Sequence, residues 1–255
     1  MNISLETQLK IMYLGIAVWP SWEFAAKKMW IWRKSLDRFG YRFFYYGVGI
    51  QQFPGYRTQK IEVPLAHLKE HGWGDCTHIL YTDCCDCLML APPGEIETKY
   101  EALGRPPMLI SGSAQLSNVS DPARYPIFDQ GSELFRYPHV GGYLMEAPLA
   151  VEFLQMLHDR YPQCGDDCFA WYDAIVDGVF APVIDTDCEI WMVNGDKYLE
   201  IIEDNGRKRI RKTATAKLPA IWHNAGGYAD LVTYRDAVMR PMAERLGIIA
   251  EGEQP

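Results

Sequence analysis

The sequence predicts an α/β fold in which buried strands alternate with amphipathic helices. Short apolar runs rich in β-branched and aromatic residues recur along the chain, and segments with apolar residues at helical spacing separate them. That alternation is typical of a sheet that opens with parallel strands and carries helices on both faces. At 255 residues, of which 48% are hydrophobic, the chain is expected to form one domain with a sizeable core.

The first third of the chain is expected to form the opening of this sheet. Ser21 suits the N-cap of the first helix, Gly40 suits its end, and Pro64 suits an early position of the second helix. A polar, glycine-containing loop separates the second strand from that second helix. The expected order is a strand at 11–18, a helix at 21–39, a strand at 41–46, a helix at 64–71 and a strand at 78–82.

The rest of the chain predicts further strands and helices, one hairpin and one long loop. The pair Asn205-Gly206 between two strand-like segments is a strong signal of a tight hairpin turn. The loop at 112–126 is rich in small and polar residues, and loops of such length in a compact domain are usually functional. Helices are expected at 95–103, 148–157, 168–176 and 231–246, and strands at 107–111, 143–146, 183–185, 190–194, 198–202, 209–215 and 220–222.

Two aspartates, Asp83 and Asp86, follow the third predicted strand, at the point where the chain must turn. In α/β folds, ligands bind outside the carboxyl ends of the strands. Two carboxylates at such a turn can share one divalent cation, because Mg²⁺ and Mn²⁺ prefer oxygen ligands and keep positions open for phosphate. The pattern also fits a structural role, in which Asp83 caps the turn and Asp86 is solvated.

Charge and cysteine content narrow the class of protein. A net charge of −8 argues against binding of nucleic acid or anionic membrane by the whole surface, and no stretch reads as a signal peptide or a membrane span. Seven cysteines, an odd number, with Cys84, Cys85 and Cys87 close together, indicate reduced thiols and a cytoplasmic location. A zinc site that adds Cys76 and His78 to these thiols would lack the paired spacing of structural zinc sites.

The order of the segments resembles the glycosyltransferase domain of the procollagen lysyl hydroxylases. The resemblance runs from about residue 11 to residue 227 as short blocks that keep the order of that family. It implies a GT-A-type, Rossmann-like mixed sheet flanked by helices in a single domain, with a nucleotide-binding half over about 1–90 and an acceptor-binding half over about 91–255. The matching blocks are Gln59-Lys60, Asp83 and Asp86, Gly141-Gly142, Asp166-Asp167, Ile184-Asp185 and His223.

The resemblance also implies what these residues bind. Asp83, Asp86 and His223 would hold Mn²⁺, or Mg²⁺ in its place. The donor would be a nucleotide sugar, and a UDP-sugar is expected. Cys84 and Cys85 stand where the family has an aromatic residue that packs on the base. The residues expected to contact the donor are Gln59, Lys60, Cys85, Gly141, Gly142 and Gly226.

The chemistry of sugar transfer gives some of these side chains a role. Negative charge develops on the departing nucleoside diphosphate, and a divalent ion neutralises it. Lys60 is a cation for the phosphates, or else a solvated surface lysine. Asp166 or Asp167 would orient the sugar hydroxyls or deprotonate the acceptor, with Asp167 favoured. In a structural role, the same pair would only supply negative charge at a helix N-terminus.

The segment 207–212 carries five positive charges in six residues of an acidic chain, on Arg207, Lys208, Arg209, Arg211 and Lys212. Such charges can simply protect an edge strand from aggregation. They can also dock an anionic acceptor, such as a nucleic acid with a hydroxylated base, because phosphate contacts position a strand while the active site selects the base. The family resemblance implies a hydroxylated polypeptide instead, and a glycan is a further alternative.

The sequence therefore predicts a metal-dependent glycosyltransferase that moves a hexosyl or pentosyl group from a nucleotide sugar to a hydroxyl acceptor. Two other classes of protein fit the same residues. A non-catalytic module for nucleotide sugars or carbohydrates would bind Mn²⁺ and nucleotide without loss of a donor sugar. A metal-dependent phosphoryl-transfer or hydrolytic enzyme would release phosphate instead of a sugar.

Overall fold

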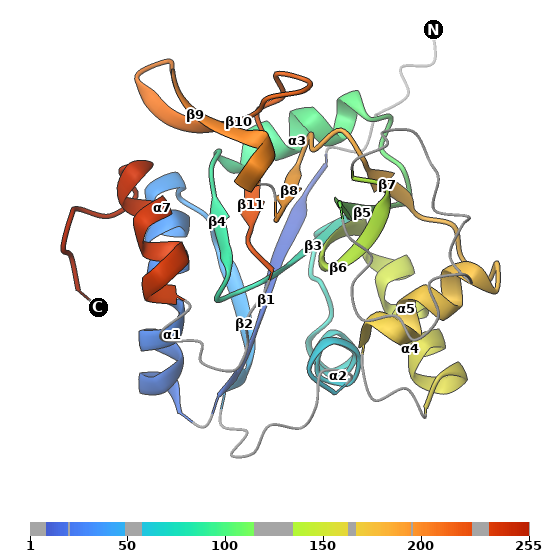
Figure 1. Ribbon diagram of the computed structural model, residues 1–255. Helices are drawn as coiled ribbons and strands as arrows, with labels where there is room; N and C mark the ends of the chain where they lie inside the picture. The colour runs from blue at the N-terminus through green and yellow to red at the C-terminus, as the bar shows by residue number, and fades with distance from the viewer. Residues whose placement is uncertain are drawn as a thin grey trace, which may run out of the picture.

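A six-stranded sheet forms the centre of the computed structural model, with helices on both sides (Figure 1). The structure describes residues 9–19, 21–48, 58–114, 135–162, 167–194, 196–225 and 235–254. The six strands are β1 (Ile11–Trp19), β2 (Phe43–Val48), β3 (His78–Asp83), β5 (Met108–Ser113), β6 (Tyr137–Glu146) and β7 (Val183–Asp185). They lie in the order β2-β1-β3-β6-β5-β7.

The sheet is mixed, with β6 as the reversed strand. β1 pairs in parallel with both β2 and β3, so the parallel opening predicted from the sequence is confirmed. β6 runs antiparallel to β3 and to β5, and β5 pairs in parallel with β7. The carboxyl ends of β1, β3, β5 and β7 therefore share one edge of the sheet, and β6 begins at that edge.

The two faces of the sheet bury different helices, because successive strand residues point to opposite sides. Met12 and Ile79 pack in the same core cluster as residues of α2, α4 and α5, whereas Tyr13 and Leu80 pack with residues of α1. Figure 1 shows α2, α4 and α5 on one side of the sheet and α1 with α7 on the other. The bounds are α1 (Trp22–Phe39), α2 (Val63–His71), α4 (Ala147–Arg160), α5 (Asp167–Val176) and α7 (Arg240–Arg245).

A second sheet lies beside the first and consists of three short, fully buried strands, β4 (Cys87–Met89), β8 (Trp191–Val193) and β11 (Ile221–His223). The central strand, β11, pairs antiparallel with β4 and parallel with β8. This pairing places His223 opposite Cys87, although the two residues lie far apart in the sequence. The remaining elements are α3 (Pro93–Ala102), the hairpin β9 (Leu199–Asp204) and β10 (Arg207–Lys212), a 3₁₀ turn at Asp196–Tyr198 and π-helical turns η1 (Thr58–Glu62) and η6 (Arg235–Met239).

Most predicted elements are present with shifted ends, but β4 was not predicted, and three further differences are large. The strand expected at 143–146 begins at Tyr137, because the chain before it also pairs with β5. The helix expected at 231–246 appears as η6 followed by α7, and residues 231–234 lie outside the described part of the chain. The loop expected at 112–126 begins later, since β5 reaches Ser113, and residues 115–134 also lie outside the described part. The hairpin turns at Asn205-Gly206 as predicted, with Asp204 paired to Arg207.

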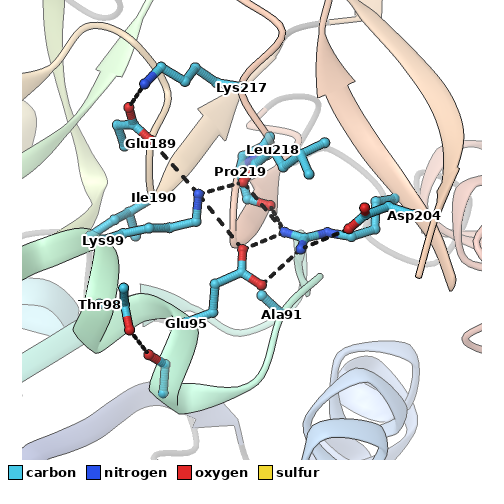
Figure 2. A network of polar contacts seen from close by, with 12 residues as sticks. Ala91, Glu95, Thr98, Lys99, Glu189, Ile190, Asp204, Lys217, Leu218 and Pro219 are labelled. Atoms are coloured by element: carbon cyan, nitrogen blue, oxygen red, sulfur yellow. Dashed lines mark hydrogen bonds and ion pairs between the residues drawn. The ribbon is translucent and has the colours of Figure 1, made fainter. Parts of the chain in front are cut away.

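A network of ion pairs connects the β9–β10 hairpin to α3 (Figure 2). The Arg209 guanidinium donates to both carboxylate oxygens of Glu95, over 2.8 and 2.6 Å, and its side chain is only 8% exposed. Lys99 lies 3.7 Å from Glu95 and 3.8 Å from Glu189, and it donates to the carbonyl of Leu218 over 2.8 Å. Arg209 is therefore a structural residue of the hairpin.

The predicted cluster of five exposed charges on 207–212 is wrong for Arg209 and Lys212, because both are buried. Lys212 is 1% exposed, donates to the carbonyl of Thr186 over 3.1 Å and lies 4.8 Å from the Phe135 ring centroid. Arg211 is half-buried and donates to Glu200 across the hairpin over 2.8 Å. Arg207 and Lys208 are the exposed members of the cluster.

We expect Arg209→Ala to lower the free energy of unfolding by about 3 kcal/mol, because the substitution leaves Glu95 without its bidentate partner in a poorly hydrated site. Arg207→Ala, two positions earlier on the same strand and exposed, is the matched control and should change stability by about 0.5 kcal/mol or less. Urea denaturation followed by tryptophan fluorescence measures both. Equal effects of the two substitutions would contradict a structural role for Arg209.

Candidate functional site

Asp83 ends β3 at the carboxyl edge of the main sheet, and its two carboxylate oxygens are held separately. The Tyr81 hydroxyl donates to Oδ1 over 2.6 Å, and the Lys60 ammonium donates to Oδ2 over 3.0 Å. Tyr81 can reach Asp83 because residues two apart on a strand lie on the same face. Burial alone would raise the pKa of Asp83, but Lys60, His223 and the Tyr81 hydrogen bond lower it below the usual value. Asp83 is therefore a fixed, ionised carboxylate.

Asp86 and His223 come from the second sheet and meet Asp83 at the same place. Asp86 directly precedes β4, His223 ends β11, and the Asn224 amide donates to the Asp86 carbonyl over 2.9 Å. His223 Nε2 lies 3.4 Å from Asp86 Oδ1 and 3.7 Å from Asp83 Oδ2. Asp86 is 1% exposed and His223 is fully buried. The solvated role considered for Asp86 is therefore wrong.

The close approach of these groups depends on a glycine. A Cβ atom on Gly141 would stand 2.9 Å from Asp83 Oδ2 and from His139 Cε1, and still closer to His223 Cε1. The backbone of β6 is irregular at this point: Ile110 of β5 pairs with Tyr143, but Ser111 pairs with His139, so residues 140–142 have no partner on β5. Irregularities of this kind re-aim side chains next to functional sites.

The donor atoms at this place fit a divalent cation. Within the part of the chain that the structure describes, neither ring nitrogen of His223 has a hydrogen-bond partner, although both are buried. A buried imidazole without partners is costly, and a metal ligand removes that cost. Ligand atoms about 2 Å from one ion lie roughly 3–4 Å apart, and His223 Nε2 lies at such a distance from one oxygen of each aspartate. Asp83, Asp86 and His223 could hold such an ion.

Cys87 offers a second donor set with Asp86 and His223, whose ligand atoms all lie within 4.8 Å of one another. The Cys87 thiol is fully buried, and its sulfur accepts a hydrogen bond from the Thr82 hydroxyl over 2.9 Å. Burial, then the charges of Asp86 and Asp83, raise the pKa of this thiol well above its usual value. An ion that prefers oxygen ligands would therefore take Asp83 as its third ligand, whereas a softer ion would favour Cys87.

Lys60 and Asp167 complete the charged surroundings of Asp83. Lys60 lies in the π-helical turn η1 before α2, and π-turns are frequent at functional sites. Its ammonium is 3.7 Å from Asp167 Oδ2 as well as 3.0 Å from Asp83 Oδ2, and its side chain is 15% exposed. Asp167 opens α5 and is 2% exposed. The solvated role considered for Lys60 is therefore wrong.

The structure describes the positions of only some of the other predicted site residues. Gly142 is in β6, and a Cβ atom there would stand 2.6 Å from the Trp191 indole nitrogen. Cys85 follows Asp83 in the turn before β4 and is half-buried. Gln59 lies in η1, but its side chain is outside the described part of the structure, as are Asp166 and Gly226.

Two residues with no predicted role stand out in the structure. His139 packs edge-on against His223, with ring centroids 4.8 Å apart. In the sequence, the Gly141-Gly142 pair that follows it was the signal that could have drawn attention to this residue. Asp185, at the end of β7, accepts three backbone hydrogen bonds of 2.8–2.9 Å from residues 189–191. Burial raises the pKa of Asp185 to about 6 against these hydrogen bonds, which lower it. Asp185 therefore stabilises the turn that leads into β8.

Comparison with solved structures finds a similar fold in a glycosyltransferase involved in the glycosylation of the major capsid of PBCV-1. The TM-score is 0.53 at 10% sequence identity, and the match covers 91% of this chain and 99% of that chain. The predicted GT-A-type, Rossmann-like mixed sheet flanked by helices is thereby confirmed, and at this identity the likeness shows the fold alone. No family model and no curated protein matches the sequence, so membership of the lysyl hydroxylase family stays a prediction.

Among the described helices, none is both long enough and apolar enough to cross a lipid bilayer. The six cysteines that the structure describes are all free thiols, as expected from their odd number and from the crowding of three of them in the sequence.

We expect Gly141→Ala to weaken Mn²⁺ binding by about tenfold or more, because the added methyl group must push His223 or Asp83 from its place. The control is Gly94→Ala in α3, where a Cβ atom would meet no neighbour within 4 Å. Isothermal titration with Mn²⁺ gives the affinities, and circular dichroism shows that both variants are folded. If Gly141→Ala folds and binds Mn²⁺ as well as Gly94→Ala, the ion does not lie among these side chains.

Proposed function

We propose that this chain is a metal-dependent glycosyltransferase that moves a sugar from a nucleotide-sugar donor to a hydroxyl acceptor. The observation that carries the proposal is the meeting of Asp83, Asp86 and His223, from two sheets, at the edge where α/β folds bind ligands. A fold shared with a glycosyltransferase supports the same conclusion. The resemblance of the sequence blocks to the lysyl hydroxylase glycosyltransferase domain implies this chemistry too.

Asp83, Asp86 and His223 would hold the metal, for which we propose Mn²⁺ or Mg²⁺. When bound, such an ion supplies positive charge that stabilises the departing diphosphate. The fixed carboxylate of Asp83, oriented by Tyr81 and Lys60, needs little rearrangement to serve as a ligand. Preorganised groups of this kind lower the cost of reaching the transition state.

Lys60 would bind the phosphates as a second positive charge. In this structure its ammonium contacts two carboxylates, those of Asp83 and Asp167. A lysine on a flexible stem can exchange a carboxylate oxygen for a phosphate oxygen with a small movement. We propose that the ammonium turns toward the diphosphate and thereby leaves Asp83 Oδ2 free to serve as a metal ligand. Before the donor arrives, the Lys60 ammonium thus offsets the repulsion between the two carboxylates.

Asp167 would act on the sugar or on the acceptor. Its place at the first turn of α5, beside Lys60 and almost without exposure, puts a carboxylate next to the phosphate side of the site. It would orient sugar hydroxyls, or take the proton of the acceptor hydroxyl as a general base. We propose this role for Asp167 and a supporting one for its neighbour Asp166.

The remaining contacts with the donor follow from the resemblance. Cys85, Gln59 and Gly226 would line the nucleotide, for which we propose a UDP-sugar, and Gly141 and Gly142 would lie along the sugar. Residues from about 1–90 would form the nucleotide half and 91–255 the acceptor half of one domain. Free thiols fit a reducing compartment, and we propose the cytoplasm.

The acceptor is a hydroxylated polypeptide, a glycan or a hydroxylated base in nucleic acid. Burial of Arg209 and Lys212 removes two of the charges that favoured an anionic acceptor. Lys208 still lines a surface groove with Arg245, Ile201, Ile202 and Glu203. Arg207 is exposed next to Lys208, so these two residues can still contact the phosphates of a nucleic acid. A nucleic-acid acceptor therefore remains one of the three proposals.

A panel of nucleotide sugars with Mn²⁺, followed by release of nucleoside diphosphate, tests the function without knowledge of the acceptor. We expect slow hydrolysis of one donor, and a loss of about a hundredfold or more in Asp86→Ala, because the metal loses a ligand. Asp75→Ala, at an exposed surface carboxylate, is the control. Release of inorganic phosphate would point to the phosphoryl-transfer class, and binding without release to a non-catalytic module.

Separate replacement of Asp166 and Asp167 by Asn tests the roles of the pair. We expect Asp167→Asn to lose about a hundredfold or more in turnover, with Mn²⁺ affinity kept, because the general base or orienting group is lost while the metal ligands remain. Asp166→Asn should have a much smaller effect, since neighbours at a helix start point about 100° apart. Equal, mild losses in steady-state turnover would indicate that both residues only cap the helix.

A further inference from the structure

His139 lies inside the site but has no role in the proposed reaction. It stands at the carboxyl edge of the main sheet, just before the irregular turn of β6, and is 8% exposed. Its backbone is fixed by the Ser111 hydroxyl, which donates to the His139 carbonyl over 2.8 Å. Its ring packs edge-on against His223, with ring centroids 4.8 Å apart and planes at 79°. A side chain held in this way can either contact a ligand or only pack against its neighbours.

One hydrogen bond decides which nitrogen of His139 carries the proton. The Gly141 amide donates to His139 Nδ1 over 3.2 Å, so Nδ1 must offer its lone pair. A neutral imidazole has one such nitrogen, and the other, Nε2, then carries the hydrogen. With its one lone pair in use, His139 is a donor and a poor metal ligand. His223 differs, because neither of its ring nitrogens has a hydrogen-bond partner among the described residues.

The hydrogen bond from Gly141 also requires a neutral ring, because a doubly protonated imidazole has no lone pair with which to accept it. The only hydrogen bond of its ring to a described residue is the one from Gly141, so Nε2–H remains available to donate. Besides His139 itself, the atoms nearest to a Cβ atom on Gly141 would belong to Asp83 and to the His223 ring that would hold the metal.

We propose that the His139 Nε2–H is a neutral hydrogen-bond donor to the diphosphate of the bound nucleotide. The proposal rests on the proposed function, and it adds a residue of this chain that binds the diphosphate beside the metal and Lys60. The diphosphate is the natural partner because its oxygens are the part of the donor that must lie against the metal ligands His223 and Asp83. A neutral donor contributes direction without further positive charge in a site that already holds Lys60 and a cation.

Substitution of His139 by asparagine or by phenylalanine separates the hydrogen-bond donor role from a packing role. In His139→Asn, the side-chain carbonyl can accept the amide hydrogen two residues on, as in an Asx-turn, and the amide group can still donate to a ligand. His139→Phe keeps a flat ring of similar size and loses both hydrogen bonds. His139→Ala is measured in parallel, so that a folding defect of one variant leaves the other available.

The probes are Mn²⁺ alone, and Mn²⁺ with inorganic pyrophosphate or with UDP, measured by isothermal titration. We expect His139→Phe and His139→Ala to bind the two diphosphates about tenfold to a hundredfold more weakly than the unaltered chain, since a hydrogen bond to a charged group is lost. His139→Asn should regain most of that affinity. Affinity for Mn²⁺ alone should stay within about twofold in all three variants, because the metal ligands are unchanged.

Each other outcome is decisive. Unchanged diphosphate affinity in His139→Phe and His139→Ala would overturn the donor role and leave the proposed function standing. A loss of Mn²⁺ affinity as large as that of His223→Ala would show that His139 is a metal ligand, which also overturns the proposal. If the unaltered chain binds Mn²⁺ but neither diphosphate, the proposed function itself fails and the inference fails with it.

Discussion

Two carboxylates and an imidazole are buried at one site. The surrounding structure depends on the need to replace the hydration that these polar groups have lost. Removal of an ionised carboxylate from water costs several kcal/mol unless cations or hydrogen-bond donors replace the lost hydration. Asp83 receives that compensation from Lys60 and Tyr81. His223 has no hydrogen bond to a described residue at either ring nitrogen, and a divalent ion is the group that its position and its neighbours fit best.

Several local features serve to bring these groups within reach of one another. The pairing of β11 with β4 carries His223 to Asp86 from more than a hundred residues away in the sequence. The irregular turn of β6 leaves residues 140–142 unpaired with β5, and the missing side chain at Gly141 makes room for the His223 ring. Precise placement of the site thus depends on strand pairing within the second sheet and on the irregular turn of β6 in the first.

The sequence predicted the succession of strands and helices up to Asp83, because apolar periodicity and glycine or proline breaks are local signals. It also predicted that Asp83 and Asp86 lie where a buried strand ends and the chain turns. His223 was a different case: nothing local distinguishes this histidine, and only the order of blocks in a known family pointed to it. The tautomer of His139 depends on a hydrogen bond from a backbone amide two residues away, which the sequence does not reveal.

For the charged hairpin, a local sequence pattern was present but misleading. Five positive charges in six residues resemble an exposed docking surface, but sequence does not show that Glu95 and the Thr186 carbonyl lie opposite two of them. Charge alone therefore predicts solvent exposure poorly where a long side chain can reach a partner from another element. Arg207 and Lys208, which no such partner buries, keep the exposure that the pattern predicted.

A crystal of the protein soaked in Mn²⁺, with data collected at a wavelength where manganese scatters anomalously, tests the central claim most directly. We expect one anomalous peak per chain, about 2 Å from a ring nitrogen of His223 and from carboxylate oxygens of Asp83 and Asp86. The Lys60 ammonium should have moved away from Asp83 Oδ2. A peak on Cys87 Sγ without Asp83, or a well-ordered site with no peak at saturating Mn²⁺, would contradict the account.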